Sequence, residues 1–71
     1  MNTQENTANR SVREDMRGAR VTVSEAAEKA GVSPNTWRLF EASREAVSDS
    51  VRARCDATHE WIRALAKARA A

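Results

Sequence analysis

The chain has 71 residues, a formal net charge of +2 and a sequence pI of about 9.3. A chain of this length forms at most one domain and buries only ~60% of its unfolded surface, which is too little for the cleft of an ordinary enzyme. Ten of its twelve basic residues are Arg, the side chain that meets phosphates and guanine edges through paired hydrogen bonds. The composition therefore argues against an enzyme and permits nucleic-acid binding.

The cysteine content and the hydropathy of the chain indicate in which cellular compartment it is expected. Cys55 is the single cysteine, which excludes an intramolecular disulfide framework and fits a reducing compartment. The sequence has no apolar run near the ~18 residues that a bilayer span requires, and no signal peptide is legible. We therefore expect a cytoplasmic protein without a membrane partner.

The N-terminal part divides into a tail and a first helix. Residues 1–10 are polar and are expected to be disordered, so the predicted domain covers residues 11–71. Ser11 and Glu14 have capping-box spacing and predict a helix over about residues 12–19. Its inward stripe is marked by apolar residues at spacings of four and three, namely Val12, Met16 and Ala19. Gly18 is expected to fray the end of this helix.

The stretch from Thr22 to Glu41 predicts two short helices joined by a tight turn. Thr22 and Glu25 form a second capping box, and Gly31 stands where a left-handed residue ends a helix. Ser33 is a good N-cap, and Pro34 suits the first helical position that follows it. The next helix carries Trp37 and Phe40 three residues apart, hence on one face. These aromatic side chains could stack on bases, but in a chain with so few large apolar residues we expect them in the core.

This stretch resembles a known family of regulators. Ala27, Gly31 and Trp37 stand at the spacing of the helix-turn-helix of phage repressor and Cro-like proteins, and residues 41–44 resemble the E-x-G-[KR] segment that closes the second helix there. The order VSEAAE, VS, a Trp and E-x-x-R-x-A-V further resembles the anti-CRISPR-associated (Aca) autorepressors. The resemblance covers residues 21–51. Two departures are Ser43, where the family commonly has Gly, and a connection before Thr22 that is about one residue shorter than usual.

Helix geometry and this resemblance together predict a DNA-reading surface. If Trp37 and Phe40 face inward, the opposite face presents the base-reading candidates Asn35, Arg38 and Leu39, with Pro34 at its leading edge. Hydroxyl groups near helix N-termini and flanking arginines are candidates for phosphate contacts: Thr22, Ser24, Ser33, Thr36, Arg20 and Arg44. The alternative for each residue is an ordinary solvated side chain. The resemblance also implies an ion pair between Glu41 and an arginine of the first helix, with Arg17 as the partner, and solvation of Glu41 is the alternative.

A long C-terminal helix is predicted over about residues 48–70, because Ser48 can cap it and neither Gly nor Pro follows. Its apolar seam steps by four, three, four and three through Val51, Cys55, Thr58, Ile62 and Leu65. We expect the distal part of the seam to extend past the core and to form a homodimer interface. The predicted interface residues are Thr58, Trp61, Ile62 and Leu65.

Metal and catalytic sites are poorly supported. Cys55 and His59 share a helical face, but zinc needs further donors, and the nearby Asp56 and Glu60 have no fixed geometry. No catalytic triad, phosphate loop or carboxylate pair is legible. We therefore expect no enzyme activity, no metal, no cofactor and no small-molecule ligand.

The sequence as a whole predicts an all-α protein of about four helices. Its expected function is sequence-specific binding of double-stranded operator DNA as a homodimer on a palindromic site, and hence transcriptional repression. The resemblance implies autorepression of a phage or mobile-element operon, with the protein at the nucleoid of a bacterial host. The alternatives are an antitoxin and a helical module that binds a partner protein through its C-terminal helix.

Overall fold

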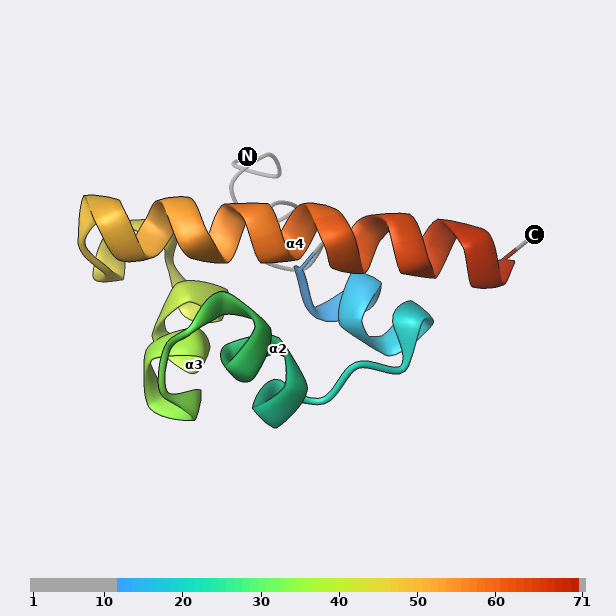
Figure 1. Cartoon of the computed structure of the whole chain (residues 1–71), viewed down its shortest axis with the longest axis horizontal. Helices are drawn as coiled ribbons and strands as arrows, with labels where there is room; N and C mark the ends of the chain where they lie inside the picture. Colours follow the sequence, from blue (N-terminus) through green and yellow to red (C-terminus); the bar gives the residue numbers. More distant parts are fainter. Residues whose placement is uncertain (1–11, 71) are drawn as a thin grey trace, which may run out of the picture.

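The computed structural model describes residues 12–70 and shows an all-α fold, which confirms the predicted fold class (Figure 1). The first helix covers residues 12–19. It is followed by α2 (Val23–Ala30), α3 (Pro34–Ala42), the short 3-10 helix η1 (Arg44–Ala46) and α4 (Asp49–Ala70). The capping box predicted at Ser11 lies outside the described residues. Among the helices that the structure describes, none is long and apolar enough to cross a membrane.

The turn between α2 and α3 is fixed by hydrogen bonds at both helix ends. At the start of α2, the Thr22 N–H donates to Glu25 Oε1 over 2.9 Å and the Glu25 N–H donates to Thr22 Oγ1 over 3.2 Å. Gly31 ends α2 with φ of 74°, in the left-handed region that glycine adopts without strain. The N–H of Thr36 then donates to Ser33 Oγ over 3.1 Å, and Pro34 takes the first turn of α3. The predicted caps are confirmed.

The first helix covers the predicted residues 12–19, but the sequence did not predict how its C-terminal end is capped. Gly18 stays helical, and the left-handed residue is Arg20, with φ of 58°. The Arg20 N–H donates to the Arg17 carbonyl over 3.2 Å and the Val21 N–H donates to the Met16 carbonyl over 2.9 Å. These two bonds are those of a Schellman motif. A Cβ at Gly18 would lie 3.3 Å from Ala66 Cβ, so this glycine permits the close approach of the first helix to α4.

The segment between α3 and α4 also differs from the expected loop. Ser43 ends α3 in an extended conformation, with φ of −162°, so the helix lacks the left-handed turn that the family's glycine would favour. The chain then enters η1. Arg52 of α4 stabilises this segment, because its guanidinium donates to the carbonyls of Arg44 and Val47 over 2.8 and 3.1 Å.

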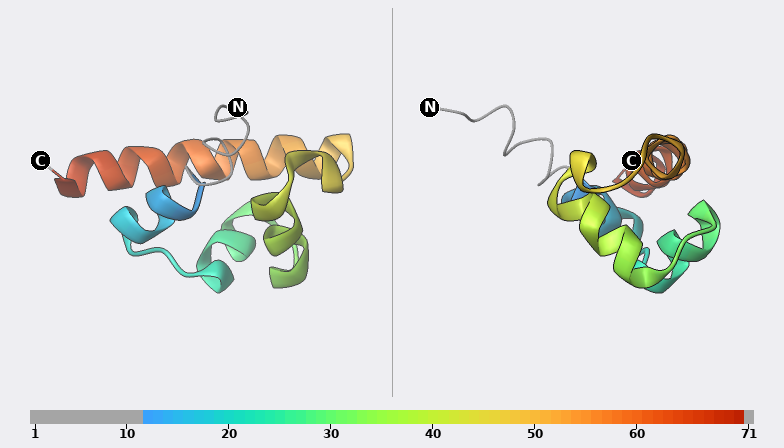
Figure 2. Two further views of the ribbon diagram at one scale, coloured as in Figure 1. Left: turned by 180° about the vertical axis from the view of Figure 1, so that it is seen from behind. Right: turned by 90° about the vertical axis from the view of Figure 1, so that its left-hand side faces the viewer.

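The core lies between α4 and the three shorter α-helices, and α4 runs across all of them (Figures 1 and 2). Trp37 and Phe40 are 0% and 1% exposed, as expected of core residues. The α2 helix contributes only small buried side chains, Ala26, Ala27 and Ala30. The predicted inward stripe of the first helix is confirmed, since Val12, Met16 and Ala19 are all buried.

Burial corrects part of the predicted dimer interface. Ile62 is 0% exposed and Thr58 is 4% exposed within a single chain. The prediction that the seam extends past the core at Ile62 is therefore wrong. The first helix packs against this part of α4, where Asp15 contacts His59 and Gly18 lies against Ala66. Leu65 is half-buried against the same core, and Trp61 remains 37% exposed.

Candidate functional site

The α3 helix has two chemically distinct faces. One face is anchored by Trp37 and Phe40, whose ring centroids lie 5.2 Å apart. On the other face, Asn35, Arg38 and Leu39 are exposed, as is Pro34 in the first turn. Leu39 is 51% exposed, so this face also presents one large apolar side chain to solvent. The four predicted base-reading residues therefore lie together on one accessible surface.

The N-terminus of α3 differs from those of α2 and α4. The first turn of α2 carries Glu25 and that of α4 carries Asp49, whereas the first turn of α3 has no acidic residue. The positive end of the α3 dipole is thus not compensated by a carboxylate of its own helix. Ser33 and Thr36 place their hydroxyl oxygens 2.9 Å apart at this end. The same residues that cap α3 can therefore meet an anion.

The remaining residues predicted to contact phosphate differ in their surroundings, because some are exposed and others already have a partner within the molecule. Thr22 is engaged with Glu25, whose carboxylate lies where a phosphate would have to approach. Ser24 and Arg20 are exposed. Arg44 pairs with Asp56 of α4: its Nε donates to Oδ1 over 3.1 Å, its Nη2 bonds to Oδ2, and this hydrogen bond raises the pKa of Arg44. The Arg44 side chain nevertheless remains 45% exposed, and exposed ion pairs of this kind contribute little stability. Its contact with phosphate stays a prediction.

Glu41 is buried near the end of α3, with 9% of its surface exposed. Within residues 12–70 no ion pair joins it to Arg17, whose side chain is exposed. The ion pair implied by the family resemblance is therefore not found. The first helix is joined to α4 through Asp15 instead, which lies 2.9 Å from His59 Nε2 and 3.6 Å from Arg63 Nε.

Cys55 and His59 do not form a metal site. Cys55 is fully buried, and burial raises the pKa of its thiol, which disfavours the thiolate that metals and electrophiles require. His59 is held by Asp15. Across the described part of the chain, no group of three or more His, Cys, Asp or Glu side chains could hold a metal ion.

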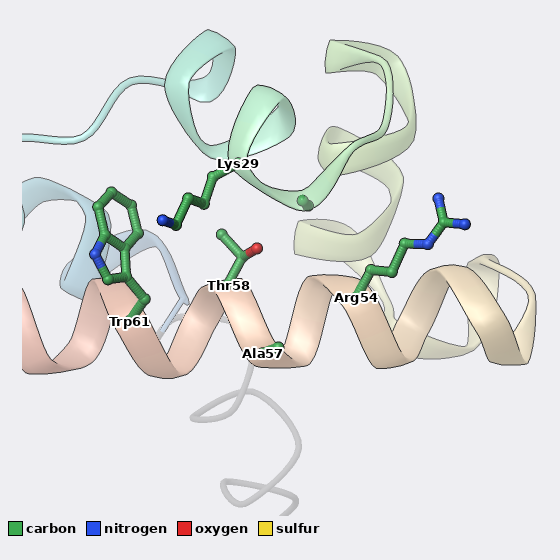
Figure 3. A pocket seen from close by; sticks show the side chains of 6 residues that line it. Lys29, Arg54, Ala57, Thr58 and Trp61 are labelled. Carbon is green, nitrogen blue, oxygen red and sulfur yellow. The ribbon is translucent and has the colours of Figure 1, made fainter.

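A second surface feature was not predicted. Between α2 and α4 lies an open cavity of about 290 Å³ (Figure 3). It is lined by Lys29, Ala30, Arg54, Ala57, Thr58 and Trp61. Sequence reasoning placed Trp61 and Thr58 in a dimer contact and gave no role to Lys29 or Arg54. The one sequence feature that pointed to this groove was the spacing of Arg54, Ala57 and Trp61, which places them on one face of the last helix.

Comparison with known protein families, with curated proteins and with solved structures finds no match to this chain.

Proposed function

We propose that this protein is a sequence-specific DNA-binding repressor that inserts α3 into the major groove. The observation that carries the proposal is the division of α3 into an anchored face and an exposed face. Trp37 and Phe40 hold the helix against the core. The side chains of Asn35, Arg38 and Leu39 are exposed, and within residues 12–70 they make no hydrogen bond or ion pair. A recognition helix needs both properties, since its base contacts must be fixed in position and still be accessible.

The chemistry of the exposed face fits direct reading of base edges. Asn can pair with the adenine edge through two hydrogen bonds, Arg can pair with guanine, and an apolar side chain can contact the thymine methyl group. Asn35, Arg38 and Leu39 supply one of each. An α-helix such as α3 is ~10–12 Å across with its side chains, which matches a major groove that is ~12 Å wide. Its N-terminus has no acidic residue in the first turn, which favours approach to phosphates.

The proposal includes two copies of the protein on a palindromic operator and autorepression of a phage or mobile-element operon in a bacterial cell. Its support is the motif spacing over residues 21–51, described above. Two recognition helices that enter successive major grooves on one side of the duplex place their half-sites ~34 Å apart.

Selection of DNA from a randomised duplex pool, followed by fluorescence anisotropy on the selected and a scrambled duplex, tests the proposal. We expect Arg38→Ala to weaken binding to the selected duplex by ~1–3 kcal/mol for each base that the arginine reads. Binding to the scrambled duplex should change far less, because non-specific affinity comes from phosphate contacts.

The matched control is Arg69→Ala, which removes the same charge. Arg69 lies in the last turn of α4, at the end of the molecule away from α3 (Figure 1), so its loss should leave discrimination unchanged. Failure to enrich any sequence motif would overturn the proposed function. Equal losses on both duplexes for Arg38→Ala would remove this residue from the reading surface.

A further inference from the structure

The cavity between α2 and α4 is a groove with a cation at each end. From α4, Arg54, Ala57 and Trp61 line it at spacings of three and four, with Thr58 between them. From α2, Lys29 and Ala30 form the opposite wall. Seven residues of helix separate Arg54 from Trp61, a rise of ~10 Å. Figure 3 shows Lys29 directed toward Trp61 at one end and Arg54 at the other, with Ala57 and Thr58 between them.

Neither cation has a carboxylate partner within residues 12–70. The Lys29 ammonium lies 4.8 Å from the centroid of the Trp61 ring, in a cation–π contact. Arg54 donates one N–H to the Gly31 carbonyl over 3.5 Å, which is a long and weak hydrogen bond. By contrast, Arg44, Arg52 and Arg63 each lie within 4.0 Å of an aspartate. The groove therefore has, at each end of an apolar floor, a positive charge that no carboxylate of the described residues neutralises.

We propose that this groove is the docking site for an acidic segment of a partner protein. One carboxylate of the segment pairs with Lys29, a second pairs with Arg54, and an apolar side chain between them covers Ala57 and the exposed edge of Trp61. Charge complementarity identifies the occupant, because Lys29 and Arg54 are the charged residues of the lining and both are positive. Tryptophan and arginine are also the side chains most enriched among the energetically dominant residues of protein interfaces.

The size and charge of the groove favour a peptide over a small-molecule ligand or a second copy of this chain. Cavities for small ligands have volumes of ~300–1,000 Å³ and enclose most of the ligand, whereas this groove holds about 290 Å³ and is open to solvent along one side. A single small carboxylate is poorly matched to this groove, because Lys29 lies over Trp61 at one end and Arg54 lies two helical turns away along α4. A second copy of this chain carries the same net positive charge of +2, which opposes its approach to a positive groove.

Arg54 also lies beside the turn that leads into α3, since its Nη1 donates to the carbonyl of Gly31. The other N–H groups of its guanidinium are available to a carboxylate. The inference stands apart from DNA binding, since peptide binding is measured on the protein without DNA.

A displayed library of random peptides, selected against the full chain, provides the probe. We expect enrichment of peptides that carry two acidic residues flanking an apolar one. A synthetic peptide of the enriched sequence should bind the wild type with micromolar affinity. The double charge reversal Lys29→Glu with Arg54→Glu should weaken this binding at least tenfold, and Trp61→Ala should also weaken it.

The matched control is Lys67→Glu with Arg69→Glu, which makes the same change of charge at two exposed positions in the last turn of α4 and should leave peptide binding intact. Circular dichroism checks that each variant is folded, and the milder Lys29→Gln with Arg54→Gln replaces the charge reversal if the latter unfolds.

Four outcomes would overturn the inference. Enriched peptides that lack acidic residues, or that bind the charge-reversed protein equally well, would show that the groove does not select them. Equal weakening in the control would show general charge attraction. A wild-type dimer that the groove variants dissociate, seen by sedimentation, would make a second copy the occupant.

Discussion

Trp37 is the residue on which the packing of the short helices depends most directly. Its side chain is fully buried, its indole Nε1 donates to Met16 Sδ over 3.3 Å, and its ring packs against Phe40. These interactions join α3 to the first helix, although 21 residues separate Trp37 from Met16 along the chain. One side chain therefore links two elements that are not neighbours in sequence.

We expect Trp37→Ala to unfold most of the protein. Truncation of a buried aromatic side chain costs ~3–5 kcal/mol, and the entire stability of a small domain is only ~5–15 kcal/mol. Thermal melting followed by circular dichroism measures the effect. Trp61→Ala is the control at the other tryptophan, which is 37% exposed, and its melting temperature should fall much less. Similar melting temperatures for wild type and Trp37→Ala would place Trp37 outside the core.

Single-residue burial was predictable where spacing within one element decided it. Trp37 and Phe40 lie three residues apart, so they share a face whatever the helix packs against. Burial of Ile62 was not predictable in the same way, because it depends on where the first helix docks along α4. That placement is a tertiary contact, made possible by Gly18 against Ala66, and no local pattern specifies it.

At the scale of elements, the two connections that flank α2 have the same backbone conformation but use different residues. Each preceding helix ends in a left-handed residue followed by a half-buried valine: Arg20 with Val21, and Gly31 with Val32. Glycine adopts this conformation freely. A side-chain-bearing residue such as Arg20 is held there at a cost of ~1–2 kcal/mol.

This asymmetry predicts opposite effects of two substitutions. Arg20→Gly should stabilise the protein by about 1 kcal/mol, because it removes the steric cost at φ of 58°. Gly31→Ala should destabilise it by about the same amount, because it introduces that cost at φ of 74°. In a domain of this size each change moves the melting temperature by ~4–8 °C. A lower melting temperature for Arg20→Gly would contradict the strain assigned to this turn.

Helix boundaries were predictable because capping residues mark them locally. Thr22, Ser33 and Ser48 each precede a helix, as predicted. The end of the first helix at residue 19 was predicted correctly, but fraying was expected at Gly18, and nothing local indicates that Arg20 takes the left-handed conformation. There, close packing against Ala66 requires the glycine inside the helix.

At the scale of the whole molecule, the burial of α4 residues shows which of them stabilise the fold and which are left for contact with a second copy. Within residues 12–70 the exposed large apolar side chains are Leu39 and Trp61, which is a small apolar surface for a permanent dimer interface. We therefore expect pairing to be weak in the free protein and to be completed on DNA. Leu65, half-buried on the distal part of α4, remains the residue proposed at the contact between copies.

Two substitutions on α4 distinguish residues that stabilise the core from residues that join two copies. Ile62→Ala should cost ~2–5 kcal/mol of stability, as for other buried aliphatic truncations, without changing the number of copies bound to the selected duplex. Leu65→Glu should keep more of the fold and should weaken the pairing of two copies, because it places a charge at an apolar contact. Sedimentation with and without the duplex measures both effects. A stoichiometry of one copy per palindromic duplex would contradict the paired arrangement.

The outward residues of α3 could be predicted from helix periodicity. Once Trp37 and Phe40 are placed in the core, the residues on the opposite side of the helix must face solvent. The groove beside Trp61 could not be predicted in this way, because it exists only where α2 and α4 are brought together. Lys29 lies 32 residues before Trp61 in the sequence, yet its ammonium lies over the Trp61 ring. Contacts of this kind are set by how helices pack, and sequence periodicity describes one helix at a time.

The position of α4 at the end of the described fold has a consequence for synthesis. Cys55, Thr58 and Ile62 close the core from the last helix in chain order. At ~5–20 residues per second, a ribosome needs on the order of 1–4 s to make the 22 residues of α4. During that interval the first helix, α2 and α3 can pack against one another, as Trp37 does against Met16, but the face of the core that α4 supplies is missing. The core can therefore close only after the last helix of the described fold has been made.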